Sequence, residues 1–272
     1  MDTLNFLTAG MPLVTGNKGY KKALEILEDM SLDGLELEFV HGVRINDANK
    51  KLVGDSHLIK TIHAPFYINL NSQEEEKVEA SVQRIVETAR VAYDIGAFSI
   101  TYHAAFYLKM DKEDVYQQVK RQTKIITDTL DKEGITVWIR PETTGKGTQW
   151  GSLEEIVKIS KIFEKVLPCV DFSHIHARTG GEFNTYDEFS KSLEFIGKEL
   201  GSFALENFHA HVAGIEYTSK GERYHLNLEE SDFNYKDLMK ALKKFGIKGA
   251  LVCESPNIEV DAQIMKNYYL SI

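Results

Sequence analysis

The stretch Pro168-Cys169-Val170-Asp171-Phe172-Ser173-His174-Ile175-His176 decides how the rest of the chain is interpreted. The apolar run over residues 166–170 ends in a carboxylate, and an imidazole follows three residues later. This pattern is typical of a buried strand that delivers both side chains into one small volume. Carboxylate oxygen and neutral imidazole nitrogen are common ligands of zinc and of neighbouring divalent metals. An Asp at a strand end is also a frequent helix cap or turn former, so the metal interpretation depends on how the other strands end.

The composition is that of an ordinary globular protein. The chain has 272 residues, of which 43% are hydrophobic and 27% are charged, so disorder is not expected. A single (β/α)8 barrel of about 250 residues accommodates this length. The formal net charge of −9 argues against a protein that holds nucleic acid by bulk positive charge. It does not exclude a phosphate substrate, because bound metal ions can be the largest charges in a site.

Several features indicate a cytoplasmic protein without a membrane anchor. The N-terminus, Met1-Asp2-Thr3-Leu4, lacks the basic and apolar regions of a signal peptide. No apolar run approaches the ~20 residues that span a bilayer. Cys169 and Cys253 are the only cysteines, and both lie in apolar, strand-like runs. We therefore expect buried free thiols in a reducing compartment.

Strand-like and helix-like runs alternate along the whole chain. The predicted strands cover residues 4–9, 34–40, 58–63, 97–103, 135–142, 166–171, 208–212 and 249–254. Helical spacing is found at residues 20–30, 73–95, 112–132, 186–200, 235–245 and 261–269, and Ser152 opens a further helix with Glu155 at capping-box spacing. Alternation of this kind predicts a parallel sheet with helical crossovers. Eight units without a linker predict an α/β protein with a single (β/α)8 TIM barrel domain over residues 1–272.

Metal-capable side chains recur where the predicted strands end, which is where such barrels carry their reactive groups. Six successive strands each end in one, and two further histidines follow in the adjoining loops. Histidines are poor helix caps, so capping does not explain the set. More ligands than one ion uses are expected at one rim, which predicts a multinuclear site with a bridging carboxylate. The strand-end residues are His63, His103, Glu142, Asp171, His211 and Glu254, and the loop residues are His174 and His225.

Single positions leave alternatives open. His209 shares a strand face with His211 by the period of two, and His211 is preferred because it lies nearer the rim. His176 could replace His174, which is preferred because a three-residue offset returns the chain over the rim. A strand-end histidine can also be satisfied by a backbone carbonyl.

Three acidic residues have simpler explanations than metal binding. Glu254 could equally be a salt-bridge partner of a Lys or Arg. Glu36 and Glu38 are explained by strand alternation and exposure.

These segments together resemble the endonuclease IV family of metal-dependent abasic-site nucleases, within the xylose-isomerase-like barrel superfamily. The resemblance covers nearly the whole chain in order and spacing. Its most specific parts are the Glu-Thr-x-Gly-x-Gly and Asp-x-x-His segments. The matching segments are His63-Ala64-Pro65-Phe66-Tyr67-Ile68-Asn69-Leu70, His103, residues 141–151, Asp171-Phe172-Ser173-His174-Ile175-His176-Ala177, His211, Gly221-Glu222-Arg223-Tyr224-His225 and Cys253-Glu254-Ser255.

The resemblance implies a three-zinc site. His63, His103 and Glu142 would hold the first ion, and Glu142 would bridge to a second ion held by Asp171, His211 and Glu254. His174 and His225 would hold the third, and Glu142 and Glu254 would be the catalytic carboxylates.

One position departs from the family's pattern. The family has an Asp two residues before the last histidine, where this chain has Arg223. Glu222 is the nearest acid that could replace it, and Arg223 could instead supply its own positive charge. The sequence therefore predicts two to three zinc ions per chain.

The predicted activity is cleavage of damaged double-stranded DNA at abasic sites, by attack of metal-activated hydroxide on phosphorus. Phe66 and Tyr67 resemble the family's residues that wedge into the base stack, although they could simply pack the rim. Lys146 offers a cation to a phosphate. No obligate protein partner is implied.

The alternative is a sugar isomerase or epimerase of the same superfamily with one manganese or magnesium ion. The number of histidines favours the nuclease, and the net charge and Arg223 favour the isomerase. A non-catalytic, metal-stabilised binding protein is the third class.

Overall fold

The computed structural model describes residues 1–272. It confirms the predicted fold class, because eight parallel strands alternate with helices. The strand order in the sheet is β6-β4-β3-β2-β1-β12-β9-β8. The chain divides into two compact units, which we call the first unit and the second unit. The first unit comprises Met1–Leu35, Gly145–Gly147 and Cys169–Ile272, and the second comprises Glu36–Thr144 and Thr148–Pro168.

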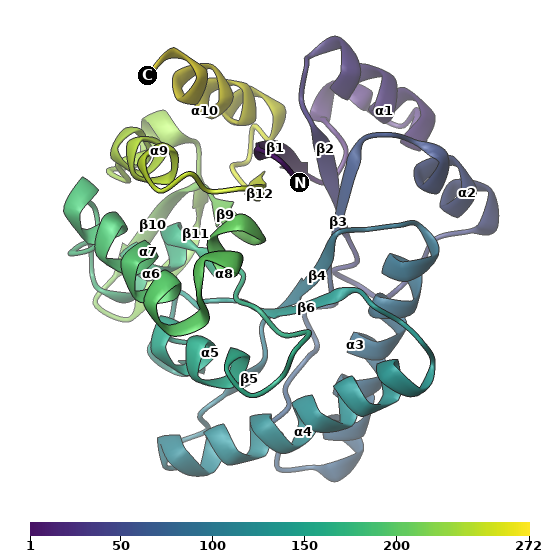
Figure 1. The fold of residues 1–272 in the computed structure, drawn as a ribbon, viewed down its shortest axis with the longest axis vertical. Helices are drawn as coiled ribbons and strands as arrows, with labels where there is room; N and C mark the ends of the chain where they lie inside the picture. The colour runs from purple at the N-terminus through teal and green to yellow at the C-terminus, as the bar shows by residue number, and fades with distance from the viewer. The chain divides into compact units, whose positions relative to one another are not determined.

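The second unit is built on the parallel strands β3, β4 and β6, with β4 paired on both sides. Helices α3 and α4 are its two longest and lie side by side (Figure 1). Their apolar positions recur at helical spacing, so one face of each is buried against the unit's core. In chain order the elements are β2 (Gly34–Glu38, which begins in the first unit), α2 (Asp47–Asp55), β3 (Ile59–His63), α3 (Glu75–Asp94), β4 (Ser99–Tyr102), β5 (Ala105–Phe106), α4 (Lys112–Lys132), β6 (Trp138–Pro141), β7 (Gln149–Trp150) and α5 (Leu153–Ser160).

The first unit is built on β1, β12, β9 and β8, with β12 between β1 and β9. Helix α10 packs beside β1, so the last helix and the first strand of the chain lie next to each other in this unit (Figure 1). The elements are β1 (Leu4–Ala9), η1 (Leu13–Thr15), α1 (Gly19–Asp29), β8 (Val170–Asp171), α6 (Phe172–Arg178), α7 (Tyr186–Leu200), α8 (Ser202–Glu206), β9 (Phe208–Val212), β10 (Gly214–Thr218), β11 (Gly221–Leu226), η2 (Leu228–Glu230), α9 (Tyr235–Lys244), β12 (Gly249–Cys253) and α10 (Glu259–Ser271).

Most predicted elements are found within a few residues of their predicted bounds. The capping box at Ser152 and Glu155 is present at the start of α5. The central strands are buried on both faces, as β12 shows with all five residues buried. Such strands read as continuous apolar runs and are therefore easy to recognise. The prediction of a single domain over residues 1–272 stays a prediction.

The structure corrects several local predictions. The predicted strand 166–171 is regular only at Val170–Asp171, and Val166 makes an isolated bridge to Ile139 of β6. His174 lies in helix α6 and His225 on strand β11, so neither is in a loop. Glu36 is fully buried and Glu38 is partly buried, so exposure does not explain them.

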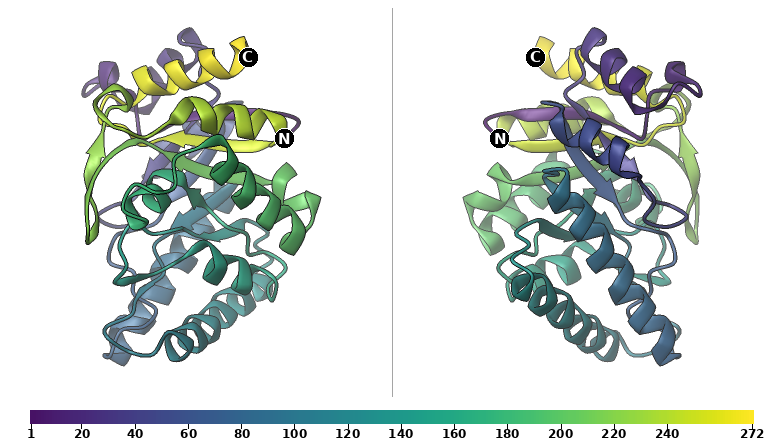
Figure 2. Two further views of the ribbon diagram at one scale, coloured as in Figure 1. Left: turned by 90° about the vertical axis from the view of Figure 1, so that its left-hand side faces the viewer. Right: turned by 90° about the vertical axis from the view of Figure 1, so that its right-hand side faces the viewer.

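The hairpin β10–β11 directly follows β9 and was not predicted. Its two strands pair antiparallel and form the ribbon coloured yellow-green in Figure 2. Because it carries His225 and Glu222, this hairpin determines the geometry of one candidate ligand group.

Candidate metal centre

In the second unit, three predicted ligands lie around one carboxylate. His63 is the last residue of β3, and His103 and Glu142 directly follow β4 and β6. The Glu142 Oε2 atom lies 3.3 Å from His63 Nε2, and its Oε1 atom lies 3.1 Å from His103 Nε2. Parallel strands end at one edge, which explains how residues far apart in sequence meet here. One donor atom from each residue falls within 4.8 Å of the others, so a single ion could contact all three.

Hydrogen bonds around this group orient its side chains. His63 Nδ1 lies 2.7 Å from the Ala64 carbonyl oxygen, so the ring donates there and directs Nε2 towards Glu142. Thr101 donates its hydroxyl to Glu142 Oε2 at 3.4 Å. Backbone carbonyls commonly fix a metal-binding histidine in this way. The backbone carbonyl therefore contacts only Nδ1 of His63, and Nε2 faces the Glu142 carboxylate.

The pKa of His63 is shifted by two opposing effects. Burial lowers it, but the hydrogen bond and negative charge of Glu142, with Glu38 and Glu36, raise it to about 10. The buried Glu36 thus acts on this group through its charge. Without a metal, the His63 imidazole is held as a cation beside the carboxylate.

Zinc binding at this group should therefore release a proton at neutral pH. Zinc needs the neutral imidazole. At pH values below the raised pKa of His63, the zinc affinity should therefore increase by up to about tenfold for each unit by which the pH rises. Calorimetric titration of zinc in two buffers of different ionisation enthalpy measures the proton release. Binding at pH 7 without proton release from this group would show that His63 is already neutral.

In the first unit, a second group is formed by Asp171, His174 and His225. Asp171 caps helix α6 by accepting from the His174 backbone N–H at 2.7 Å, while its Oδ2 lies 3.1 Å from His174 Nδ1. The cap and the ligand interpretations of Asp171 are thus compatible. The ring centroids of His174 and His225 are 5.6 Å apart. Burial lowers the pKa of His225, which leaves a neutral imidazole suited to a metal.

A β-bulge brings Glu222 to this second group. In the hairpin, Glu216 pairs with Tyr224 and Tyr217 pairs with Glu222, so Arg223 is an extra residue without a partner across the ladder. Cross-strand partners share a face, and Tyr217 shares its face with Ile215, the partner of His225. Glu222 and His225 therefore point to the same face, although three residues normally place side chains on opposite faces.

The resulting contacts differ for Glu222 and Arg223. Glu222 Oε2 lies 3.6 Å from His174 Nε2. Arg223 is directed to Glu216, with 3.8 Å between its Nη1 atom and Oε1, and its side chain is 55% exposed. Gly145 allows the approach of Glu222, because a Cβ at this position would lie 2.6 Å from the Glu222 Cβ. Of these two neighbouring residues, Glu222 is therefore the one directed to His174.

The remaining predicted ligands also lie in the first unit. His211 Nδ1 is 3.2 Å from Glu254 Oε1, and His211 is fully buried. His176, the alternative to His174, lies within hydrogen-bonding distance of Asp232 and the Phe183 carbonyl, which gives it a structural role. These contacts favour His174 over His176 as a ligand.

The predicted DNA-binding residues lie in two places. Phe66 and Tyr67 follow β3 in the second unit and are 60% and 62% exposed. The Phe66 ring meets the His63 ring edge-on at 5.9 Å, so the exposed aromatics adjoin the Glu142 group. In the first unit, Lys146 is half-buried and its carbonyl accepts a hydrogen bond from Arg178.

Sequence reasoning set His209 aside in favour of His211 and did not consider Cys169 as a ligand. Both are fully buried and lie with His211 in a third group of metal-capable side chains. The signal was present, because Cys169 and Asp171 share a strand face, as do His209 and His211.

The sequence profile of the xylose isomerase-like TIM barrel family matches residues 17–268 of this chain. The protein belongs to this family. An uncharacterized protein of Methanocaldococcus jannaschii is 44% identical to this xylose isomerase-like barrel, over 98% of this chain and 97% of its own length. A probable endonuclease 4 of Aquifex aeolicus is 23% identical, over 60% of this chain and 58% of its own. The chain thus matches less than two thirds of that endonuclease, and the match supports the resemblance stated above.

The solved structures of similar fold include an epimerase-like protein and an endonuclease. A D-tagatose 3-epimerase-like protein has a TM-score of 0.72 with 18% identity, over 97% of both chains. Endonuclease IV from Thermus thermophilus has a TM-score of 0.71 with 16% identity, over 99% of this chain and 100% of its own. The IOLI protein with a bound zinc atom has a TM-score of 0.67 with 14% identity, over 99% and 97%. These likenesses show the fold alone. None of the helices has the length and apolar composition needed to cross a bilayer.

Proposed function

We propose that this xylose isomerase-like barrel is a zinc-dependent phosphodiesterase that cleaves double-stranded DNA at abasic sites. The observation that carries the proposal is the group Asp171, His174 and His225, with Glu222 beside it. This group exists in addition to the Glu142 group, and together they offer more imidazole and carboxylate donors than one ion uses. Two or three ions per chain suit phosphodiester cleavage.

The donor sets fit zinc. Each group combines imidazole nitrogen with carboxylate oxygen, which zinc accepts readily. Bound zinc would lower the pKa of water and stabilise charge on the phosphate oxygens. The chain's own contribution is to hold Glu142 between two imidazoles. In addition, the bulge formed by Arg223 directs the Glu222 side chain towards His174. In this proposal Glu142 and Glu254 are the catalytic carboxylates.

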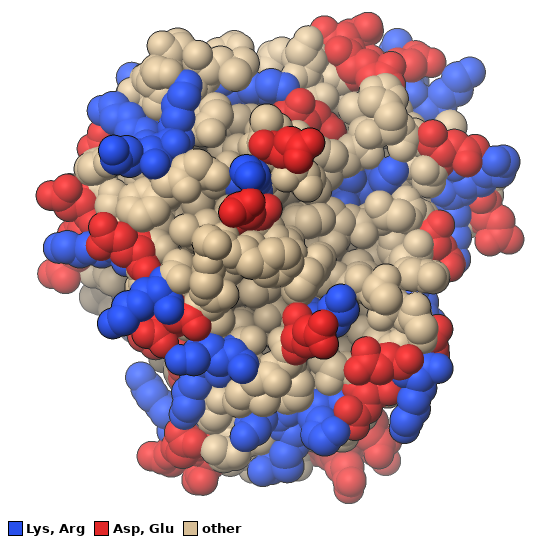
Figure 3. All heavy atoms as spheres, viewed as in Figure 1, with Lys and Arg blue, Asp and Glu red and all other residues tan.

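DNA would be recognised by local contacts. On the face drawn in Figure 3, acidic and basic side chains are interspersed and neither sign forms a continuous field. Exposed aromatic side chains next to a ligand group favour a wedge that opens the base stack. Phe66 and Tyr67 fit this role in the second unit. Lys146 would contribute one cation to a phosphate in the first unit.

The decisive experiment is incision of a duplex that carries one abasic site, with and without a chelator. The proposal expects a single cut at the abasic site that the chelator abolishes and added zinc restores. An undamaged duplex of the same sequence is the control and should stay intact. Lack of incision by protein with two or three bound zinc ions would overturn the proposal.

An epimerase or isomerase acting on a sugar is the second candidate. It is favoured by the likeness to a D-tagatose 3-epimerase-like structure and by the net charge of −9. It predicts a single manganese or magnesium ion per chain and no incision of DNA. Metal content of the purified protein separates the two candidates, and a protein without bound metal would support neither.

Replacing Phe66 and Tyr67 with Ala should weaken incision of abasic duplex by about 10- to 100-fold, because unstacking a base step takes a few kcal/mol that the wedge would supply. Zinc content should not change, since neither ring is a ligand. Incision kinetics and zinc analysis on the same preparations test this. Tyr93→Ala, at another exposed aromatic of the second unit, should leave both quantities unchanged. Equal incision by the double variant and the wild type would favour the packing role.

A further inference from the structure

A thiol and two imidazoles share one face of the sheet in the first unit. Val170 and Asp171 of β8 pair with Ala210 and His211 of β9. Continued by one residue, this register places Cys169 opposite His209. Side chains alternate along a strand, so Cys169, His209 and His211 all point to the same face.

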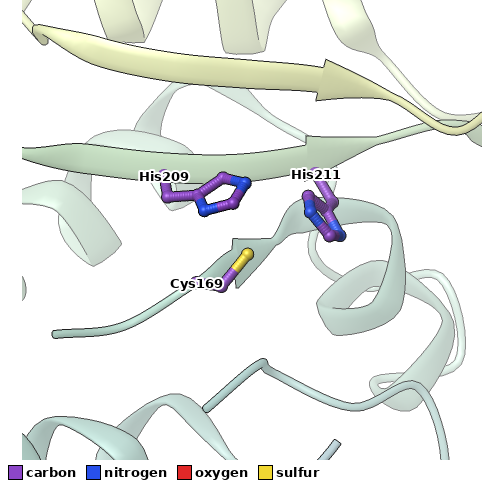
Figure 4. Close-up of side chains that lie close together, drawn as sticks. All are labelled: Cys169, His209 and His211. Carbon is purple, nitrogen blue, oxygen red and sulfur yellow. The ribbon is translucent and has the colours of Figure 1, made fainter. Parts of the chain in front are cut away.

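These three side chains are close enough to share one ion. One donor atom of each lies within 4.8 Å of the other two, and all three residues are fully buried. Figure 4 shows the Cys169 sulfur pointing towards the rings of His209 and His211. The rings themselves meet edge-on, with centroids 5.1 Å apart.

His211 also lies next to a carboxylate, with its Nδ1 atom 3.2 Å from Glu254 Oε1. An imidazole can bind a metal through one nitrogen while the other donates to a carboxylate. The contact with Glu254 is therefore compatible with a place for His211 in this group.

The donor atoms and the apolar side chains beside them favour a thiophilic metal over a hydrated ion such as magnesium. On β12, Ala250 pairs with His209 and Val252 pairs with His211, so the neighbouring wall is apolar. A sulfur with two imidazole nitrogens is a soft donor set that selects zinc and similar thiophilic ions over magnesium or manganese.

We infer that Cys169, His209 and His211 form a separate site for a thiophilic divalent metal, with zinc as the natural occupant. On binding, the Cys169 thiol gives up its proton to solvent and its sulfur bonds to the ion, while both imidazoles bind as neutral donors. Cys169 and His209 lie two residue pairs before Asp171 and His211 along the strands. It does not depend on the proposed phosphodiesterase activity.

The test replaces zinc by Co²⁺, whose bond to a thiolate gives a charge-transfer absorption that nitrogen and oxygen ligands do not give. Wild-type protein titrated with Co²⁺ should develop this band and saturate it at the intensity of one cobalt–thiolate bond per chain. Cys169→Ser should lose the band, and His209→Ala should weaken binding of that ion at least tenfold. Absence of the band from Co²⁺-saturated wild type would overturn the inference.

Cys253→Ser is the matched control. Cys253 is the only other cysteine and is equally buried, but its neighbour Val252 occupies the face of His211, so its side chain lies on the opposite face. Cys253→Ser should keep the band, which assigns it to Cys169 even if Cys169→Ser does not fold. Loss of the band in folded Cys253→Ser, or its persistence in Cys169→Ser, would contradict the assignment.

Discussion

Glu142→Gln should lose at least one bound zinc ion per chain and reduce incision at abasic sites by about 100-fold or more. The Glu142 carboxylate lies 3.3 Å and 3.1 Å from the Nε2 atoms of His63 and His103. An amide offers one neutral oxygen instead of two charged ones, so the group loses its only negative ligand. Loss of an outer partner of a metal ligand already lowers affinity by about 10- to 100-fold, and loss of a ligand should exceed this. Zinc per chain and incision rate are measured on the same sample.

The control is the same chemical change at Glu133. This residue belongs to the same unit and forms an exposed ion pair with Arg90, with 2.6 Å between Oε1 and Nη2. Exposed pairs contribute at most about 1 kcal/mol, so Glu133→Gln should keep both zinc and activity. Unchanged zinc in folded Glu142→Gln would show that Glu142 is not a ligand.

The strands were predictable from sequence because they are buried on both faces. A strand was predicted at residues 249–254 and is found as β12, since an apolar run between polar turns has few other structures available. The helices α4 and α7 were predicted with their observed bounds. Because strand ends mark the reactive edge of a parallel barrel, the strand-end residues could be selected as candidate ligands before any coordinates were known.

Features that depend on a single residue of register were not predictable. The bulge at Arg223 is one extra residue in the hairpin ladder, and no composition signal marks it. Helix α6 has only seven residues, which is too short for periodicity to reveal. Strand spacing likewise placed His209 and His211 on one face but did not indicate that Cys169 lies level with them. The full burial of Glu36 contradicts the polarity rule, and its charge contributes to the raised pKa of His63.

Glu222→Gln should remove the ion held at His174 and His225 and lower incision by about 10- to 100-fold. The bulge places Glu222 and His225 on a common face. In this proposal, Glu222 replaces the Asp that the endonuclease IV family has two residues before the last histidine. The ligands His63, His103 and Glu142 are unchanged in this variant, so the first ion at Glu142 should be retained. Anomalous scattering at the zinc edge measures the occupancy of each group separately.

Arg223→Ala tests whether Arg223 itself supplies a positive charge to the phosphate. Its guanidinium is half-exposed and directed to Glu216 at 3.8 Å, and an exposed pair of this kind is worth at most about 1 kcal/mol. If Glu222 supplies the acid, Arg223→Ala should keep the ion and change incision by no more than about twofold. If Arg223 instead supplies positive charge to the phosphate, Arg223→Ala should abolish incision while Glu222→Gln leaves it intact. Gly145→Ala should resemble Glu222→Gln, because the added Cβ would lie 2.6 Å from the Glu222 Cβ and displace that side chain. A zinc peak between His174 and His225 that survives Glu222→Gln and Gly145→Ala would show that the bulge does not serve metal binding.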